Sequence, residues 1–154
     1  MDRLSKERRG WNMSRIRGKD TSPEKTVRSL VHGLGYRFRL HRRDLPGQPD
    51  IVLPRLRAVI FVHGCYWHRH KGCRYAYTPK TRIEFWQRKF DDNVARDKQA
   101  LKSLRKRGWR ILLAWECQLS NKKALANRVI RFLAESERQA DIALRNRENS
   151  SGNI

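Results

Sequence analysis

Two short blocks of consecutive apolar residues constrain the fold of this chain more than any other feature. The first block is AVIFV, residues 58–62, and the second is ILLAW, residues 111–115. A strand that is apolar on both faces belongs inside a sheet that helices cover on both sides. Between the blocks, from about Thr81 to Lys106, apolar residues recur at the spacing of an amphipathic helix. The sequence therefore predicts an α/β sandwich in which helices flank a mixed β-sheet.

Helices are also predicted before and after these blocks. Thr21-Ser22-Pro23-Glu24 has the pattern of a helix start, with Thr21 as N-cap and Glu24 closing a capping box. Gly35 ends this helix, and a last helix covers about residues 121–138. We expect one domain over residues 21–138. The flanking regions are then a basic arm, residues 1–20, and a polar tail, residues 139–154, that we expect to be disordered.

A large positive charge indicates the kind of partner. The chain has 36 Lys and Arg against 15 Asp and Glu, a net charge of +21. Such an excess is tolerated when the partner is a polyanion, so nucleic acid is the first candidate, ahead of a ribosomal or membrane-surface role. The sequence has no apolar run of about 18 residues and no secretory signal, so we expect no membrane partner. Its three cysteines are an odd number, which favours reduced intracellular thiols.

A predicted hairpin brings a carboxylate to one end of the sheet. Residues 50–53 and 57–63 form two strands joined by a short turn, with residues 36–40 as a further strand. In this register Asp50 lies opposite position 61 or 62, beside Val62 and His63. The pattern resembles the PD-(D/E)xK nuclease core, although the second acidic residue is missing and a histidine replaces the lysine. Glu24 points inward at its helix start and could supply another carboxylate for a hard cation, or serve only as the cap.

A loop rich in cysteine and histidine follows this hairpin. Cys65, His68, His70 and Cys73 fall within nine residues, and Cys117 directly follows the second apolar block. Three cysteines and one histidine would make a closed tetrahedral zinc site that holds the loop in shape. Spacing alone leaves the histidine undecided between His68 and His70. The alternative is that the cysteines are small core residues and the histidines contact phosphates.

Several strings resemble the very-short-patch (Vsr-type) T:G mismatch repair endonucleases. The matching strings, together with the helix that starts near Glu24, are NM (residues 12–13), LPGQPD (45–50), HGCYWHRHKGC (63–73), TRIEFWQRKFDDNVARD (81–97) and GWRILLAWEC (108–117). They occur in the family's order over about residues 11–133. The resemblance implies a three-layer, restriction-endonuclease-like sandwich with a PD-(D/E)xK core and a structural zinc loop.

The resemblance also implies catalytic roles for particular residues. Asp50 binds Mg²⁺, helped by the backbone carbonyl of Val62. His68 works with the attacking water, while Glu24 and His63 support catalysis. The implied reaction is hydrolysis of one phosphodiester on the 5′ side of the thymine in a T:G mismatch, which arises when 5-methylcytosine deaminates. The metal neutralises the phosphate and a histidine takes a proton from water.

The zinc ligands and the DNA contacts are implied in the same way. Zinc is held by Cys65, His70, Cys73 and Cys117. The loop between His70 and Cys73, Lys71-Gly72, is one residue longer here than in a member of the family. Contacts to double-stranded DNA come from Met13, Tyr66, Trp67 and Trp86. From spacing alone Trp86 is better placed in the core, on one stripe with Ile83 and Phe90, and Trp109 and Trp115 are also expected in the core.

Two other functions compete with this one. One is a non-catalytic, zinc-dependent nucleic-acid-binding module, and the other is a related nuclease with a different DNA target. The family further implies a monomeric protein in the bacterial cytoplasm, associated with the nucleoid when on DNA and with mismatch-repair proteins as possible partners.

Overall fold

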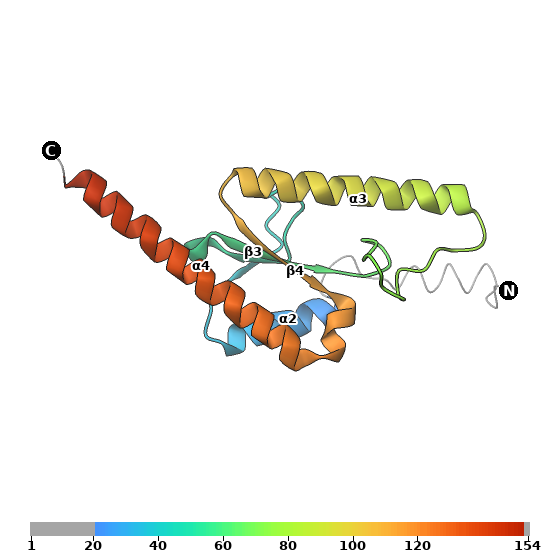
Figure 1. Ribbon diagram of the computed structural model, residues 1–154, viewed down its shortest axis with the longest axis horizontal. Helices are drawn as coiled ribbons and strands as arrows, with labels where there is room; N and C mark the ends of the chain where they lie inside the picture. Colours follow the sequence, from blue (N-terminus) through green and yellow to red (C-terminus); the bar gives the residue numbers. More distant parts are fainter. Residues whose placement is uncertain (1–20, 153–154) are drawn as a thin grey trace.

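A mixed sheet lies between two layers of helices in the computed structural model, which describes residues 21–152 (Figure 1). The strands follow the order β1-β2-β3-β4 across the sheet. β1 pairs antiparallel with β2, β2 antiparallel with β3, and β3 parallel with β4. Their bounds are β1 Arg39–Leu40, β2 Ile51–Leu53, β3 Ala58–His63 and β4 Arg110–Trp115. The predicted α/β sandwich with a mixed sheet, and the interior position of the strand at residues 57–63, are confirmed.

The helices divide between the two faces of this sheet. α3 (Ile83–Lys106) lies along one face, and α2 (Ser22–Gly33) and α4 (Lys122–Ser151) lie along the other (Figure 1). Successive side chains of a strand point to opposite faces of the sheet, so each strand supplies apolar residues to both helix layers. Val52 and Val59 pack toward α3, whereas Ile51, Leu53 and Ile60 pack toward α2 and α4. The described part of the chain also contains two short 3-10 helices, η1 Pro54–Leu56 and η2 Glu116–Ser120.

The start of α2 follows its sequence signals. Thr21 is the N-cap and its hydroxyl accepts a hydrogen bond from the Glu24 backbone N–H at 3.4 Å. Val27 and Val31 are fully buried on the sheet side. Gly35 has a φ of +88°, a left-handed conformation that glycine adopts without strain as the chain leaves the helix. The predicted helix is confirmed, and Glu24 is buried at its first turn.

The predicted apolar stripe of α3 is wrong at its N-terminal end. Phe90 and Leu104 are buried, but Ile83 is 56% exposed and Trp86 is only partly buried. Figure 1 shows the cause, because the first turns of α3 project past the end of the sheet. Helical spacing identifies a face of the helix, but it does not reveal where the sheet beneath that face stops.

Residues 139–151 also differ from expectation. They continue α4 instead of forming a structureless tail, and this part of the helix is mostly exposed. The segment contains no glycine or proline before Gly152, and seven of its 13 residues are Ala, Gln, Leu, Arg or Glu, which favour helices even without packing. Within residues 21–152, none of the helices combines the length and the apolar character that crossing a membrane requires. Met13 and the predicted basic arm, residues 1–20, lie outside the described residues.

Candidate active site and metal centre

The hairpin places Asp50 against the end of β3. Ile51 pairs with Ile60, so Asp50 lies opposite position 61, as its predicted register requires. A carboxylate oxygen of Asp50 accepts a hydrogen bond from the Val62 backbone N–H at 2.6 Å. Burial raises the pKa of Asp50 to about 6, with a smaller contribution from the charge of Glu24, while the Val62 N–H opposes the rise. A carboxylate in this position would be stabilised by a cation.

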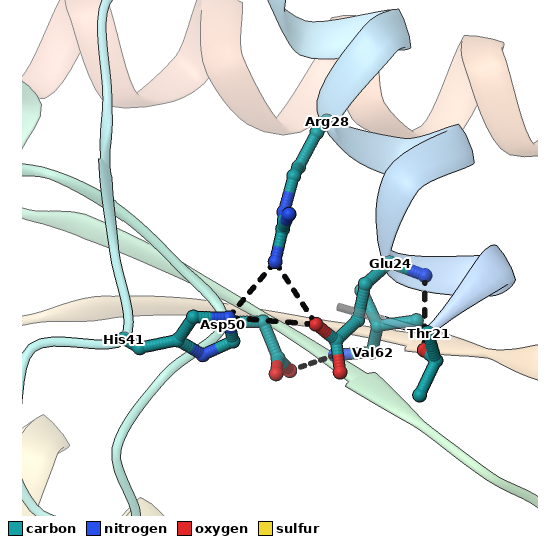
Figure 2. Close-up of polar contacts among 6 residues, drawn as sticks. All are labelled: Thr21, Glu24, Arg28, His41, Asp50 and Val62. Carbon is teal, nitrogen blue, oxygen red and sulfur yellow. Dashed lines mark hydrogen bonds and ion pairs between the residues drawn. The ribbon is translucent and has the colours of Figure 1, made fainter. Parts of the chain in front are cut away.

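A second group of side chains surrounds Asp50 (Figure 2). One guanidinium nitrogen of Arg28 donates to Glu24 Oε2 at 3.1 Å and to His41 Nε2 at 2.8 Å. The same His41 nitrogen lies 3.6 Å from Glu24 Oε2. Because a guanidinium can only donate, His41 Nε2 is the acceptor in its contact with Arg28. Three segments therefore converge at this point: the first turns of α2, the residue after β1 and the residue before β2.

Neither Arg28 nor His41 was predicted at the site. Arg28 follows Glu24 by one helical turn, a spacing at which an ion pair could have been anticipated. His41 has a φ of +47° in the loop after β1. No sequence pattern predicts that a histidine in this loop turns toward the sheet.

Glu24, His41 and Asp50 together fit a metal ion. One ligand atom from each lies within 4.8 Å of the others. Two carboxylates match the oxygen preference of Mg²⁺, and the imidazole would also suit first-row transition metals. Val62 contacts Asp50 through its N–H, so the metal-binding role of its carbonyl stays a prediction.

A pair of stacked histidines forms the next part of the site. The rings of His63 and His68 are parallel, 6° apart in plane with centroids 3.8 Å apart. His68 Nδ1 is 2.7 Å from a carboxylate oxygen of Asp97. Burial and the charge of His68 lower the pKa of His63 to about 4, so His63 is neutral near pH 7. With Nδ1 held by Asp97, the other ring nitrogen of His68 is the one that could exchange a proton.

Asp97 is a functional candidate that sequence reasoning missed. It lies on α3 between Val94 and Leu101, so it shares the inward face of that helix. The sequence signal that could have identified it is an acidic residue on the apolar face of a helix.

One cleft contains both the Glu24–His41–Asp50 group and the stacked histidines with Asp97. It has a volume of about 1070 Å³, and its lining includes Glu24, His41 and Asp50 together with His63, His68 and Asp97. Asn93 and Arg96 of α3 line the same cleft. A phosphodiester bound here would meet carboxylates suited to a metal, a histidine suited to proton transfer, and an arginine of opposite charge.

The predicted zinc ligands converge at the same edge of the sheet. Cys65 follows β3 and Cys117 follows β4, and these parallel strands end side by side. His70 Nδ1 lies 3.7 Å from Cys65 Sγ and 3.4 Å from Cys117 Sγ. With Cys73, the four ligand atoms all lie within 4.8 Å of one another. Three sulfurs and one imidazole fit a structural Zn²⁺. His68 groups with His63 and Asp97 instead, so the geometry favours His70 as the histidine of this set.

Aromatic side chains gather beyond the zinc loop. Tyr66 lies edge-on to Trp67 and to Phe90, with centroid distances of 5.1 and 5.2 Å, and Trp67 lies 5.9 Å from Trp86. The placement of Trp86 in the core is wrong, because Trp86 is only partly buried in this cluster. Its place there follows from the projection of α3 past the sheet.

Trp109 and Trp115 are not fully buried either. Trp109 packs at the edge of the core on the α3 side. Trp115 stacks on His70 with centroids 4.2 Å apart and contacts the edge of His63 at 5.3 Å. Trp115, the last residue of β4, therefore contacts both the predicted zinc ligand His70 and the stacked histidine His63.

Comparisons with known proteins agree with this geometry. Residues 1–74 match the family model described as DNA mismatch endonuclease Vsr. The chain is 53% identical over 135 residues to the type II nicking enzyme V.XorIIP of Xanthomonas oryzae pv. oryzae, covering 88% of this chain and 98% of that protein. It is 42% identical over 125 residues to the DNA mismatch endonuclease Vsr of Escherichia coli K12, covering 81% of this chain and 80% of that protein.

A solved structure supports the architecture. The catalytic domain of the homing endonuclease I-Bth0305I superposes with a TM-score of 0.55 at 19% identity, covering 76% of this chain and 98% of that domain. At this identity the likeness concerns the fold alone. It confirms the predicted restriction-endonuclease-like arrangement of a mixed sheet flanked by helices.

Proposed function

Because the chain belongs to the family of the DNA mismatch endonuclease Vsr and is therefore a DNA endonuclease, we propose that it nicks one strand on the 5′ side of the thymine in a T:G mismatch. The observation that carries the proposal is the shared cleft, in which Asp50 and Glu24 face the dyad of His68 and Asp97. Membership of this family sets aside the alternative of a non-catalytic binding module.

We propose that Asp50, with the backbone of Val62, holds a catalytic Mg²⁺ and that Glu24 supports its hydration shell. When bound, Mg²⁺ would neutralise the scissile phosphate and stabilise the leaving oxygen. His68 takes the proton from the attacking water, because Asp97 fixes its Nδ1 and leaves Nε2 available. His63 stacks on His68 and keeps the ring in place.

We propose a structural Zn²⁺ at Cys65, His70, Cys73 and Cys117. The donor set and its closure by residues after two neighbouring strands support this role. The ion would fix the loop from which Tyr66 and Trp67 extend. With Trp86 these aromatics would enter the base stack at the weakly stacked mismatch. Met13 would add a contact from the region outside the described residues.

A panel of duplexes tests the proposed function directly. Labelled T:G, matched and branched duplexes are incubated with the protein in Mg²⁺ and in EDTA, and the products are mapped on both strands. We expect a single nick 5′ of the thymine, in the T:G duplex alone and only with Mg²⁺. Equal cutting of matched duplex, or preference for the branched one, would assign the chain to the alternative of a nuclease with another target. A mismatch is asymmetric, so we also expect a monomer to act, which sedimentation of the complex can check.

A further inference from the structure

Arg69 lies in the loop that carries Tyr66 and Trp67 of the aromatic cluster. Arg69 is half-buried between two candidate functional residues, His68 and His70, and has a left-handed φ of +53°. Its guanidinium lies 4.0 Å from the centroid of the Phe90 ring and 5.8 Å from that of Tyr66. Neither the proposed chemistry nor the proposed zinc site makes use of this side chain.

The hydrogen bonds of Arg69 join two separate stretches of the loop. One terminal nitrogen donates to the carbonyl of Tyr66 at 3.3 Å and to that of Tyr77 at 3.0 Å. The other donates to the carbonyl of Ala76 at 3.0 Å and to the hydroxyl of Thr78 at 3.2 Å. Residues 76–78 come after the last zinc ligand in the loop and precede α3. Arg69 thus joins residues 76–78, which lead into α3, to the turn that contains Tyr66.

The ring contacts place the Arg69 guanidinium next to the aromatic cluster of Tyr66, Trp67 and Trp86. Phe90 lies 5.2 Å from Tyr66, 6.4 Å from Trp67 and 6.0 Å from Trp86 between ring centroids. The Arg69 guanidinium therefore lies over a ring that contacts Tyr66, Trp67 and Trp86, the three residues proposed to act as a wedge in the base stack. The planar, forked guanidinium of arginine can lie on a ring while its two terminal nitrogens reach separate acceptors, whereas the ammonium of lysine has three donors on one nitrogen and no planar face.

We propose that Arg69 is a specificity-determining positioning residue, which holds Tyr66, Trp67 and Trp86 in the arrangement that enters the mismatch. The inference rests on the proposed wedge function of these aromatics. Its physical basis is preorganisation, since an aromatic wedge that is already ordered loses less conformational entropy on entering the DNA. The competing role for Arg69 is a simple phosphate contact, which requires its charge but not its fork.

Two substitutions of Arg69 and one matched control separate these roles. Arg69→Lys keeps the charge but loses the fork, and Arg69→Met loses both. Arg74→Lys is the control, because Arg74 lies in the same loop but donates to the hydroxyl of its neighbour Tyr75. Zinc content and melting temperature are measured first, and we expect all variants to retain the metal.

Two readouts then follow. Hydrogen exchange of the DNA-free protein reports the order of residues 66–78, and the ratio of T:G to matched duplex affinity reports discrimination. We expect Arg69→Lys to exchange faster in this segment and to lose about tenfold in discrimination, the effect of one lost charge-assisted hydrogen bond. Its affinity for matched duplex should stay near that of wild type, and Arg74→Lys should change neither readout.

The two readouts also distinguish failure of this inference from failure of the proposed function. If wild type does not prefer the T:G duplex, the proposed mismatch function is wrong, and exchange alone then decides whether Arg69 orders the loop. Unchanged exchange in Arg69→Lys would overturn the inference in either case. So would normal discrimination by Arg69→Lys combined with weaker matched-duplex binding by Arg69→Met, because that pattern identifies a phosphate contact.

Discussion

Two groups of ligand-type side chains lie at the same edge of the sheet and differ in their donor atoms and in their exposure to the cleft. The group of Cys65, His70, Cys73 and Cys117 offers three sulfurs and one imidazole, the donor set of a closed four-ligand site. The group of Glu24, His41 and Asp50 offers mainly oxygen and opens on a large cleft. The donor chemistry thus suits one group to a structural ion and the other to an ion that contacts substrate.

Trp115 connects the cysteine group to the cleft on which the carboxylate group opens. Its ring stacks on His70 and also contacts His63, which lines that cleft with Glu24 and Asp50. Damage to one group could therefore reach the other through a single ring. The following predictions test how independent the two groups are, beginning with the largest expected effect.

Asp50→Ala should abolish nicking while the fold and the zinc remain. The substitution removes a proposed ligand of the catalytic metal, and we expect a loss of about a thousandfold or more in the single-turnover rate. It also removes a buried carboxylate whose raised pKa shows that its ionised form is unfavourable without a cation. The melting temperature should therefore not fall. Normal nicking by this variant in Mg²⁺ would rule out the proposed catalytic site.

Cys73→Ser should produce the opposite pattern, with stability lost before chemistry. Elemental analysis of the wild type should give one zinc per chain, and the variant should hold less. Because metal binding in such a loop is coupled to folding, we expect the melting temperature to fall by about 10 °C or more. A metal-free protein that melts and cuts like wild type would show that the four residues do not form a structural site.

Asp97→Asn should lower the rate by about 10- to 100-fold, as expected when the partner that orients a catalytic histidine is weakened. The amide can still meet His68 Nδ1, but it lacks the negative charge that stabilises a protonated ring. Single-turnover rates should fall while zinc content and T:G affinity stay unchanged. Asp91→Asn, an exposed substitution on the same helix, is the matched control. Equal rates for the two variants would remove Asp97 from the mechanism.

The comparison of the two groups also shows what sequence can predict. The contact of Asp50 with Val62 follows from a short hairpin, where local register fixes the neighbours. The zinc set could be proposed because cysteine and histidine at close spacing have few other uses. The choice of His70 over His68 needed either the family or the structure, since both lie in one loop and their directions depend on its turns.

Other features depended on tertiary structure that no local pattern encodes. His41 reaches the cleft because of a left-handed residue after β1. Ile83 and Trp86 follow the stripe of α3, but the first turns of this helix project past the end of the sheet (Figure 1). Residues 139–151 have the propensity of a helix, and polarity alone was a poor guide to their structure.

Trp67→Ala tests the smallest expected effect, in which both groups remain and recognition alone is lost. Trp67 is partly exposed beside Tyr66 and Trp86, past the zinc ligands and away from the core of the sheet. A wedge contributes binding energy mainly where the stack is already weak, so its removal should reduce T:G affinity more than matched-duplex affinity. We expect the ratio to fall by about tenfold, with zinc content and matched-duplex affinity retained. A fluorescent base analogue beside the mismatch should brighten with wild type and stay quenched with the variant.

Tyr75→Ala, which removes an exposed aromatic from the same loop, is the control. If Trp67→Ala discriminates as well as wild type, recognition comes from groove contacts, and the region beyond the zinc loop has no role in choosing the site of the nick.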